Sequence, residues 1–242
     1  MRGMLIMLKR LGTTVLDVLF PRRCVFCSAI LKDKSREVCA LCEMKLPYTG
    51  SVNCEQYFDY LNCCYSPLYY RGNVRESLLR FKFRGLHTYS KTYAKFIAKC
   101  IDECEVSCDI ISWVPVSPLR KHLRGYDQAR LLAEELAKLR GTECVRVLRK
   151  IRHNRAQSSI QDAAKRKRNA SGVYRCIAPE LVRGKCILLV DDIVTTGSTL
   201  SSAAAVLKEA GAASVEAVTV ARAVKNTKKI QTDKKEHSFS LY

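Results

Sequence analysis

The chain has 242 residues, of which 48% are hydrophobic, so it can bury a sizeable core within one α/β domain and a smaller module. Its formal net charge of +19 favours a polyanionic partner, namely nucleic acid, a phosphate-rich ligand or an anionic membrane surface, with solubility alone as the alternative. The apolar residues near the N-terminus are broken by Lys9 and Arg10 and precede no small-residue cleavage site, so we expect neither a secretory signal nor a transmembrane segment.

Leucine and valine residues recur at helical spacing over residues 1–20, which predicts an amphipathic helix. We expect its apolar face to pack against the protein itself, with a membrane surface or a partner as the alternative. Thirteen cysteines would suggest disulfides in a secreted chain, but because no secretory signal is visible we infer a reducing setting, in which clustered thiols bind metal more often than they form disulfides. The protein is therefore expected in the cytoplasm, with the inner face of the membrane as an alternative place.

Two Cys-x-x-Cys pairs, Cys24 with Cys27 and Cys39 with Cys42, follow this segment. Each such turn offers two thiolates from one tight loop, and four thiolates match the tetrahedral coordination of zinc. A redox dithiol would explain one pair but not two. We therefore predict a Zn²⁺ ion held by all four cysteines, with a structural role because no coordination position stays open.

The remaining cysteines form no second pair of this kind. Whether Cys54, Cys63 and Cys64 bind a second metal is left open by their spacing. Cys100, Cys104 and Cys108 lie four residues apart on a helical pattern, and we interpret them as small buried hydrophobic residues.

Helix-like and strand-like segments alternate from about residue 68 onward. In chain order they are a helix at 88–101, a strand at 109–116, a helix at 126–141, a strand at 143–150, a turn and a buried strand at 182–190, a helix at 198–212 and a strand at 214–222. Asp127 can cap the second of these helices and Gly141 can end it. The alternation predicts an α/β fold, with a mostly parallel sheet flanked by helices.

The charge and cysteine patterns divide the chain into four units. We expect an N-terminal helix at 1–20, a cysteine-rich zinc module at 21–66, an α/β domain at 67–223 and a lysine-rich disordered tail at 224–242.

Residues 187–200, "ILLVDDIVTTGSTL", place Asp191 and Asp192 directly after a buried strand. Ligands of open α/β sheets bind beyond the carboxyl ends of the strands. The loop at 195–199 leads into a helix whose N–H groups would attract an anion, and Gly197 lets the backbone approach it closely. Capping or a metal site would explain the isolated aspartate pair. The whole stretch fits a phosphorylated ribose better, because the carboxylates can accept from sugar hydroxyls while the loop holds a phosphate.

This stretch resembles the phosphoribosyl-diphosphate (PRPP) signature of type I phosphoribosyltransferases. The resemblance implies that Asp191 and Asp192 are the catalytic carboxylates, which contact the ribose hydroxyls, and that Mg²⁺ accompanies PRPP. It also implies that the 5′-phosphate is bound by Thr195, Thr196, Gly197, Ser198 and Thr199.

Two further segments resemble motifs of one family. "WVPVSPLRKHLRGYDQARLLAEELA" (113–137) is similar to a Val-Pro-Val-Pro…Arg-Gly-Phe-Asn-Gln segment, with Tyr126 and Asp127 as variants. "LRKIRHNRAQSSIQDAAKRKRNASGVY" (148–174) is similar to an Arg…Gln…Arg…Asn segment. With the cysteine module, these segments resemble the ComF family of competence proteins, of the ComFC type.

The family resemblance implies that residues 67–223 form a phosphoribosyltransferase-like domain. It further implies a role in natural transformation, in which the protein handles incoming single-stranded DNA in the cytoplasm. Competence-machinery proteins are expected partners, and a second copy of the chain is expected by analogy with type I relatives.

Basic residues cluster in two places beside the aspartates. Arg120, Lys121 and Arg124 follow the strand that ends near Pro115, where type I enzymes place their pyrophosphate loop. Residues 146–175 contain ten Lys or Arg against one acid. This segment is expected to include a flexible basic loop with Arg152, Arg155, Gln157, Arg166, Arg168 and Asn169. The cations would stabilise departing pyrophosphate or follow the phosphates of DNA, and a solvated helix face is the third interpretation.

Three functions follow from these features. The first is a DNA-uptake protein that binds PRPP and single-stranded DNA. The second is an active transferase that moves the phosphoribosyl group to a nucleobase or an amine with release of pyrophosphate. The third is a regulator that senses PRPP without catalysis.

Overall fold

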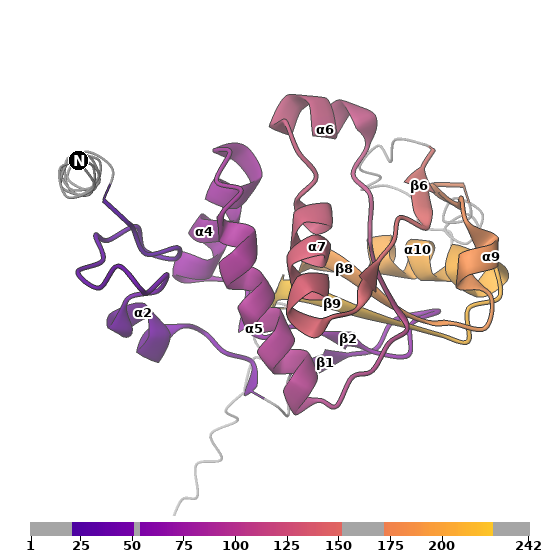
Figure 1. The fold of residues 1–242 in the computed structure, drawn as a ribbon, viewed down its shortest axis with the longest axis horizontal. Helices are drawn as coiled ribbons and strands as arrows, with labels where there is room; N and C mark the ends of the chain where they lie inside the picture. Colours follow the sequence, from indigo (N-terminus) through magenta and orange to yellow (C-terminus); the bar gives the residue numbers. More distant parts are fainter. Residues whose placement is uncertain (1–20, 51–53, 152–171, 225–242) are drawn as a thin grey trace, which may run out of the picture.

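The computed structural model describes residues 21–50, 54–151 and 172–224 (Figure 1). The predicted N-terminal helix at 1–20, the basic loop residues from 152 to 171 and the tail beyond residue 224 lie outside the described residues. Within the described part, the predicted fold class is confirmed, because helices flank a mostly parallel sheet.

The described elements include helices and strands near those predicted from residue 88 onward, together with short elements that the sequence pattern did not predict. They are α2 Ala40–Lys45, β1 Glu55–Gln56, β2 Cys64–Tyr65, β3 Leu68–Tyr69, α4 Gly72–Phe83, α5 Tyr89–Glu103, β4 Ile110–Trp113, α6 Pro118–Arg124, α7 Gln128–Arg140, β5 Glu143–Cys144, β6 Leu148–Lys150, β7 Tyr174–Cys176, α9 Pro179–Val182, β8 Cys186–Val194, α10 Ser198–Glu209 and β9 Ser214–Arg222.

Strand β8 lies in the middle of the main sheet, which has the order β1-β2-β9-β8-β4-β5 with β3 also paired to β9. It pairs in parallel with β4 on one side and with β9 on the other. Only β1 runs antiparallel to its neighbour among these described strands. A central parallel strand is covered on both faces, which explains why Ile187–Val190 is a continuous aliphatic run.

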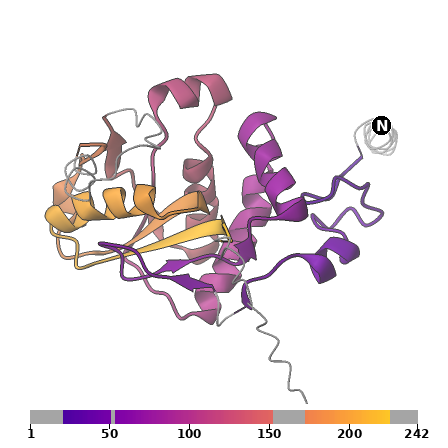
Figure 2. The ribbon, with the colours of Figure 1, turned by 180° about the vertical axis from the view of Figure 1, so that it is seen from behind.

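Two apolar layers cover the sheet. Leu188 and Val190 face a cluster built from α4, α5 and α7, whereas Ile187 and Leu189 face a second cluster built on α10. The views from the two sides agree with this arrangement, since α5 and α7 lie over one face and α10 over the other (Figure 1 and Figure 2). Alternate residues of one strand thus point into opposite halves of the core.

Local signals set the ends of α7 as predicted. The Asp127 carboxylate accepts from the N–H of Arg130 at 3.3 Å, and Gly141 closes the helix in a left-handed conformation with φ of 62°. The helix over Pro118–Arg124, where the sequence predicted a loop, has equally clear ends. Ser117 caps it, Pro118 occupies its first turn and Gly125 ends it with φ of 79°.

The predicted strand at 143–150 is wrong as a single element. Residues 143–144 add β5 to the main sheet, whereas residues 148–150 form β6 and pair with β7 in a separate two-stranded ribbon. Val147 and Leu148 turn into the cluster around α10, which breaks the strand between the two halves. The segment 21–66 contributes β1 and β2 to the main sheet, and its predicted boundary as a zinc module stays a prediction.

We predict that Leu188→Ala lowers the free energy of unfolding by about 2–5 kcal/mol, because the side chain is fully buried at the centre of the sheet and its loss leaves a cavity. Urea unfolding in zinc-containing buffer would measure this. Leu139→Ala on α7, where the side chain is 51% exposed, is the matched control and should shift stability by less than about 0.5 kcal/mol. Equal losses in the two variants would contradict the assignment of β8 as the centre of the core.

Candidate functional site

Asp191 and Asp192 lie within β8 rather than after it, since β8 continues to Val194. On the β9 side the ladder runs on past Asp191, which is in register with Thr219. On the other side β4 ends at Trp113, in register with Val190, so the two aspartates extend beyond the end of this neighbour. The pair therefore borders a gap in the hydrogen-bonding pattern at the carboxyl edge of the sheet.

This edge is also the point where the chain changes direction across the sheet. From β8 the chain passes through α10 to β9 on one side, and from β4 it passes through α6 and α7 to β5 on the other. The crevice between two strands whose connections leave in opposite directions is the usual ligand site of open α/β sheets. The topology alone thus selects the place where the aspartate pair stands.

The two carboxylates have different partners. Oδ2 of Asp192 pairs with Nζ of Lys82 at 3.0 Å, and Oδ1 of Asp191 accepts from the N–H of Asp192 at 2.8 Å. Burial and the adjacent Asp192 raise the pKa of Asp191, against the opposing effects of that N–H and of Lys82. Burial also raises the pKa of Asp127, which feels the charge of Asp192 as well. The carboxylates of Asp127, Asp191 and Asp192 thus lie close enough for their charges to interact, and their negative charge favours cationic or hydroxyl partners.

The loop after β8 forms an open anion site. Gly197 has φ of 76° and stands at the N-terminus of α10, where no side chain caps the helix. The ring of Phe58 lies against its Cα, so a side chain at this position would collide with the ring. The hydroxyls of Thr196 and Ser198 lie 3.1 Å apart, and Thr195 and Thr199 are exposed. Uncapped N–H groups and hydroxyls at a helix N-terminus suit a phosphate.

Of the predicted cations, Arg120 shares two neighbours with Asp191. It lies on α6 close enough to affect the pKa of both Lys150 and Tyr174, and these two residues also feel the charge of Asp191. Lys121 instead acts on Asp127. Arg124 turns away, since its Nη1 donates to Oε1 of Gln128 at 3.1 Å and its guanidinium lies over the Phe83 ring.

Lys82 and Lys150 are site residues that the sequence pattern did not single out. Burial and Arg120 lower the pKa of Lys150, which sits over the Tyr174 ring at 5.3 Å from its centroid. The only sequence signal for Lys82 is the basic run "RFKFRG", which ends at Gly85. Lys82 reaches Asp192, and Lys150 comes within the electrostatic influence of Asp191, only through tertiary packing.

The β6–β7 ribbon brackets the predicted basic loop. Lys150 is in register with Tyr174, and the N–H of Ile151 donates to the carbonyl of Val173 at 2.9 Å. The residues that flank segment 152–171 are therefore joined to each other, and the predicted site residues of that segment lie outside the described residues.

The four predicted zinc ligands come together. The sulfurs of Cys24, Cys27, Cys39 and Cys42 all lie within 4.8 Å of one another, and Cys27 and Cys39 are 3.7 Å apart. Burial raises the pKa of Cys24, but hydrogen bonds from backbone N–H groups outweigh it and lower the value to about 7. Four protein thiols in one tight cluster fit a structural zinc ion, as predicted.

No helix among the described residues is both long enough and apolar enough to cross a membrane.

Comparison with known proteins identifies two regions. The pattern of the phosphoribosyl transferase domain family matches residues 124–239, and that of the double zinc ribbon domain family matches residues 15–60. A solved structure, glutamine phosphoribosylpyrophosphate amidotransferase from B. subtilis, covers 55% of this chain and 26% of its own with 24% identity. The TM-score of this match is 0.39.

Three curated relatives are similar along the sequence. Competence protein F of Haemophilus influenzae is 23% identical over 84% of this chain and 98% of its own length. Competence protein ComFC of Bacillus subtilis is 32% identical over 63% of this chain and 61% of its own. DNA utilization protein YhgH of Escherichia coli is 36% identical over 45% of this chain, which spans about half (47%) of that relative. The two matched regions and these relatives together show that the chain is a ComF-type member of the phosphoribosyltransferase superfamily with an N-terminal zinc ribbon region.

Proposed function

We propose that the protein binds PRPP at the carboxyl edge of β8 and single-stranded DNA on the basic surface beside it, and that it acts in DNA uptake in the cytoplasm. One observation carries the proposal: the aspartate pair of β8 stands at the switch point of the sheet, one short loop from the uncapped N-terminus of α10. Hydroxyl acceptors and a phosphate site at this separation match a ribose 5-phosphate.

Each part of PRPP then has a partner. The ribose hydroxyls donate to Asp191 and Asp192, and the N–H groups of the first turn of α10 bind the 5′-phosphate. Lys82 pairs with Asp192, and Lys150 feels the charges of both Arg120 and Asp191, so these three cations would balance the charge of the diphosphate. Mg²⁺ prefers oxygen ligands, so these carboxylates and the diphosphate would hold it, where it would neutralise the diphosphate charge.

DNA binding is supported by charge and by the relatives. Two relatives carry competence in their names and one carries DNA utilization. The charge of +19 is concentrated partly on α6, all of whose residues remain unburied, with Arg120 and Lys121 exposed. Phe83 is 64% exposed under Arg124 and offers a surface on which a base could stack. Competence-machinery proteins and a second copy of the chain are proposed partners through the same family membership.

Transfer of the phosphoribosyl group is the second candidate function. It is favoured by Arg120 and Lys150, because Lys150 feels the charges of both Arg120 and Asp191, near the place proposed for the diphosphate. A nucleobase or amine would bond to C1 of the ribose as the bond between C1 and the diphosphate oxygen breaks and pyrophosphate leaves. The cations would stabilise the departing charge. Binding of PRPP without pyrophosphate release from any acceptor would support a PRPP sensor instead.

We predict that Asp191→Asn weakens binding of Mg²⁺-PRPP by about 10- to 100-fold, because the ribose hydroxyls lose a charged acceptor. Calorimetry would measure the affinity, and a pyrophosphate assay with a panel of bases and amines would run on the same samples. Asp109→Asn is the matched control, since Asp109 accepts from the N–H of Cys186 at 2.8 Å at the opposite end of β8. Unchanged affinity in Asp191→Asn would refute the proposed ribose site.

We predict that PRPP binding strengthens as the pH rises from about 5 to 9. Burial and the neighbouring Asp192 raise the pKa of Asp191, so its ionised, accepting form is populated only above the ordinary range of an aspartate. Asp192→Asn removes the charge that raises this pKa most after burial and should move the midpoint to lower pH. The titration of PRPP itself is common to both proteins, so coincident profiles would contradict the prediction.

We predict that Arg120→Ala combined with Lys121→Ala weakens single-stranded DNA binding and reduces the slope of log affinity against log salt by roughly 1.4, about 0.7 for each lost phosphate contact. Fluorescence anisotropy at several salt concentrations would measure both effects. Lys91→Ala with Lys138→Ala removes two exposed cations from α5 and α7 and is the matched control. Equal slopes for the two double variants would rule out a DNA track over α6.

A further inference from the structure

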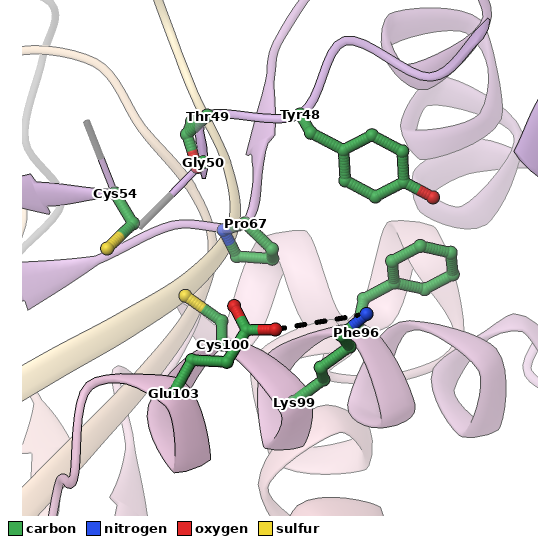
Figure 3. Close-up of a pocket in the computed structure, with 9 residues that line it drawn as sticks. All are labelled: Tyr48, Thr49, Gly50, Cys54, Pro67, Phe96, Lys99, Cys100 and Glu103. Atoms are coloured by element: carbon green, nitrogen blue, oxygen red, sulfur yellow. Dashed lines mark ion pairs between the residues drawn. The ribbon is translucent and has the colours of Figure 1, made fainter. Parts of the chain in front are cut away.

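A second group of thiols lies apart from the predicted zinc ligands. The sulfurs of Cys54, Cys100 and Cys104 all lie within 4.8 Å of one another, and Cys54 and Cys104 are 3.3 Å apart. Figure 3 shows the sulfurs of Cys54 and Cys100 pointing toward each other from different segments. The sequence pattern grouped Cys54 with Cys63 and Cys64, and neither of those two belongs to a cluster of three or more candidate ligands within the described ranges.

Regular structure fixes both sides of this cluster. Cys100 and Cys104 lie four residues apart at the end of α5, so their side chains share one face of the helix. Cys54 directly precedes β1, which pairs with β2, and its carbonyl accepts from the N–H of Ser66 at 3.0 Å. The end of α5 therefore holds two of the sulfurs, and the backbone beside β1 holds the third.

The distances suit a metal ion. Sulfurs bound at about 2.3 Å to a tetrahedral zinc ion are about 3.8 Å apart. The sulfurs of Cys54, Cys100 and Cys104 lie within 4.8 Å of one another, as do those of the predicted zinc cluster, in which Cys27 and Cys39 are 3.7 Å apart. The earlier interpretation of Cys100 and Cys104 as ordinary buried hydrophobic residues does not explain why a third thiol from another segment joins them.

The family match gives an independent reason to expect a second metal. The double zinc ribbon pattern covers residues 15–60, where the chain has five cysteines, and the first cluster uses four of them. A second ion in this region thus has Cys54 as its one remaining cysteine ligand within the match. Helix α5 supplies two further thiols at the place where Cys54 lies.

We propose that Cys54, Cys100 and Cys104 bind a thiophilic metal ion of the zinc class, with a fourth position open to an exchangeable ligand. A cavity of about 210 Å³ adjoins Cys54 and Cys100 and is lined also by Thr49, Pro67 and Glu103. Glu103 faces Lys99 at 3.8 Å across its rim (Figure 3). This space can hold a water molecule or a small donor ligand. The bound ion would tie the segment before β1 to α5.

Metal analysis of the full-length chain, purified under reducing conditions and loaded with Zn²⁺, tests the site. We expect two zinc ions per chain in the wild type and one in Cys100→Ser/Cys104→Ser. Cys108→Ser/Cys144→Ser also loses two partly buried thiols, which lie outside both clusters, and should keep two ions. Cd²⁺ titration followed by thiolate-to-metal absorbance should count seven bound thiolates in the wild type and four in the first variant.

Specific results would overturn the proposal. One zinc ion and four bound thiolates in the wild type would do so. The free thiols can be alkylated directly in cells with a reducing interior, so that only disulfides already present survive. A disulfide between Cys54 and Cys104 in such protein would assign the cluster to redox chemistry instead. If the double variant fails to fold, as judged by circular dichroism, Cys54→Ser decides the question, because it leaves α5 intact and should also retain one ion.

Discussion

The structure depends on the unequal pairing of β8 with its two neighbours. The β8–β9 ladder continues to Arg222, whereas the β8–β4 ladder stops at Val190. This difference leaves Asp191 paired with Thr219 of β9 on one side, while the aspartate pair has no strand partner on the side of β4. The central strand holds the pair in place, so burial and the charge of Asp192 keep the pKa of Asp191 raised, and Lys82 opposes them only in part.

Strand β9 links the cysteine-rich segment to this site. It pairs with β2 and β3 as well as with β8, and the hydroxyls of Ser66 and Thr219 meet in the core at 2.7 Å. Thr219 is in register with Asp191 on the next strand. A buried hydrogen bond of this kind costs free energy when one partner is lost, so the two segments hold a fixed relative register. The cysteine-rich segment at 21–66 is thereby part of the same packed structure as the aspartate pair.

Interactions between residues close in the sequence made the fold class and part of the site predictable. The continuous run Ile187–Val190, the cap at Asp127 and the turn at Gly141 each act within a few residues, and each outcome agrees with the sequence pattern. The split between β5 and β6 was not predictable, because it depends on which half of the core receives Val147. Lys82 reaches Asp192 from α4, 110 positions away in the chain, and no periodicity records such a contact.

The two thiol clusters differ in whether local spacing or tertiary packing brings their sulfurs together. Cys24, Cys27, Cys39 and Cys42 lie in two short turns, so their spacing alone indicates a shared ion. Cys54 and Cys104 are joined only because α5 packs against β9 while β2, the partner of β1, pairs with β9. The cluster is thus a consequence of the sheet order and not of any local motif. A cysteine spacing that indicates buried hydrophobic residues on one helix can therefore complete a metal site when the fold brings a third thiol to it.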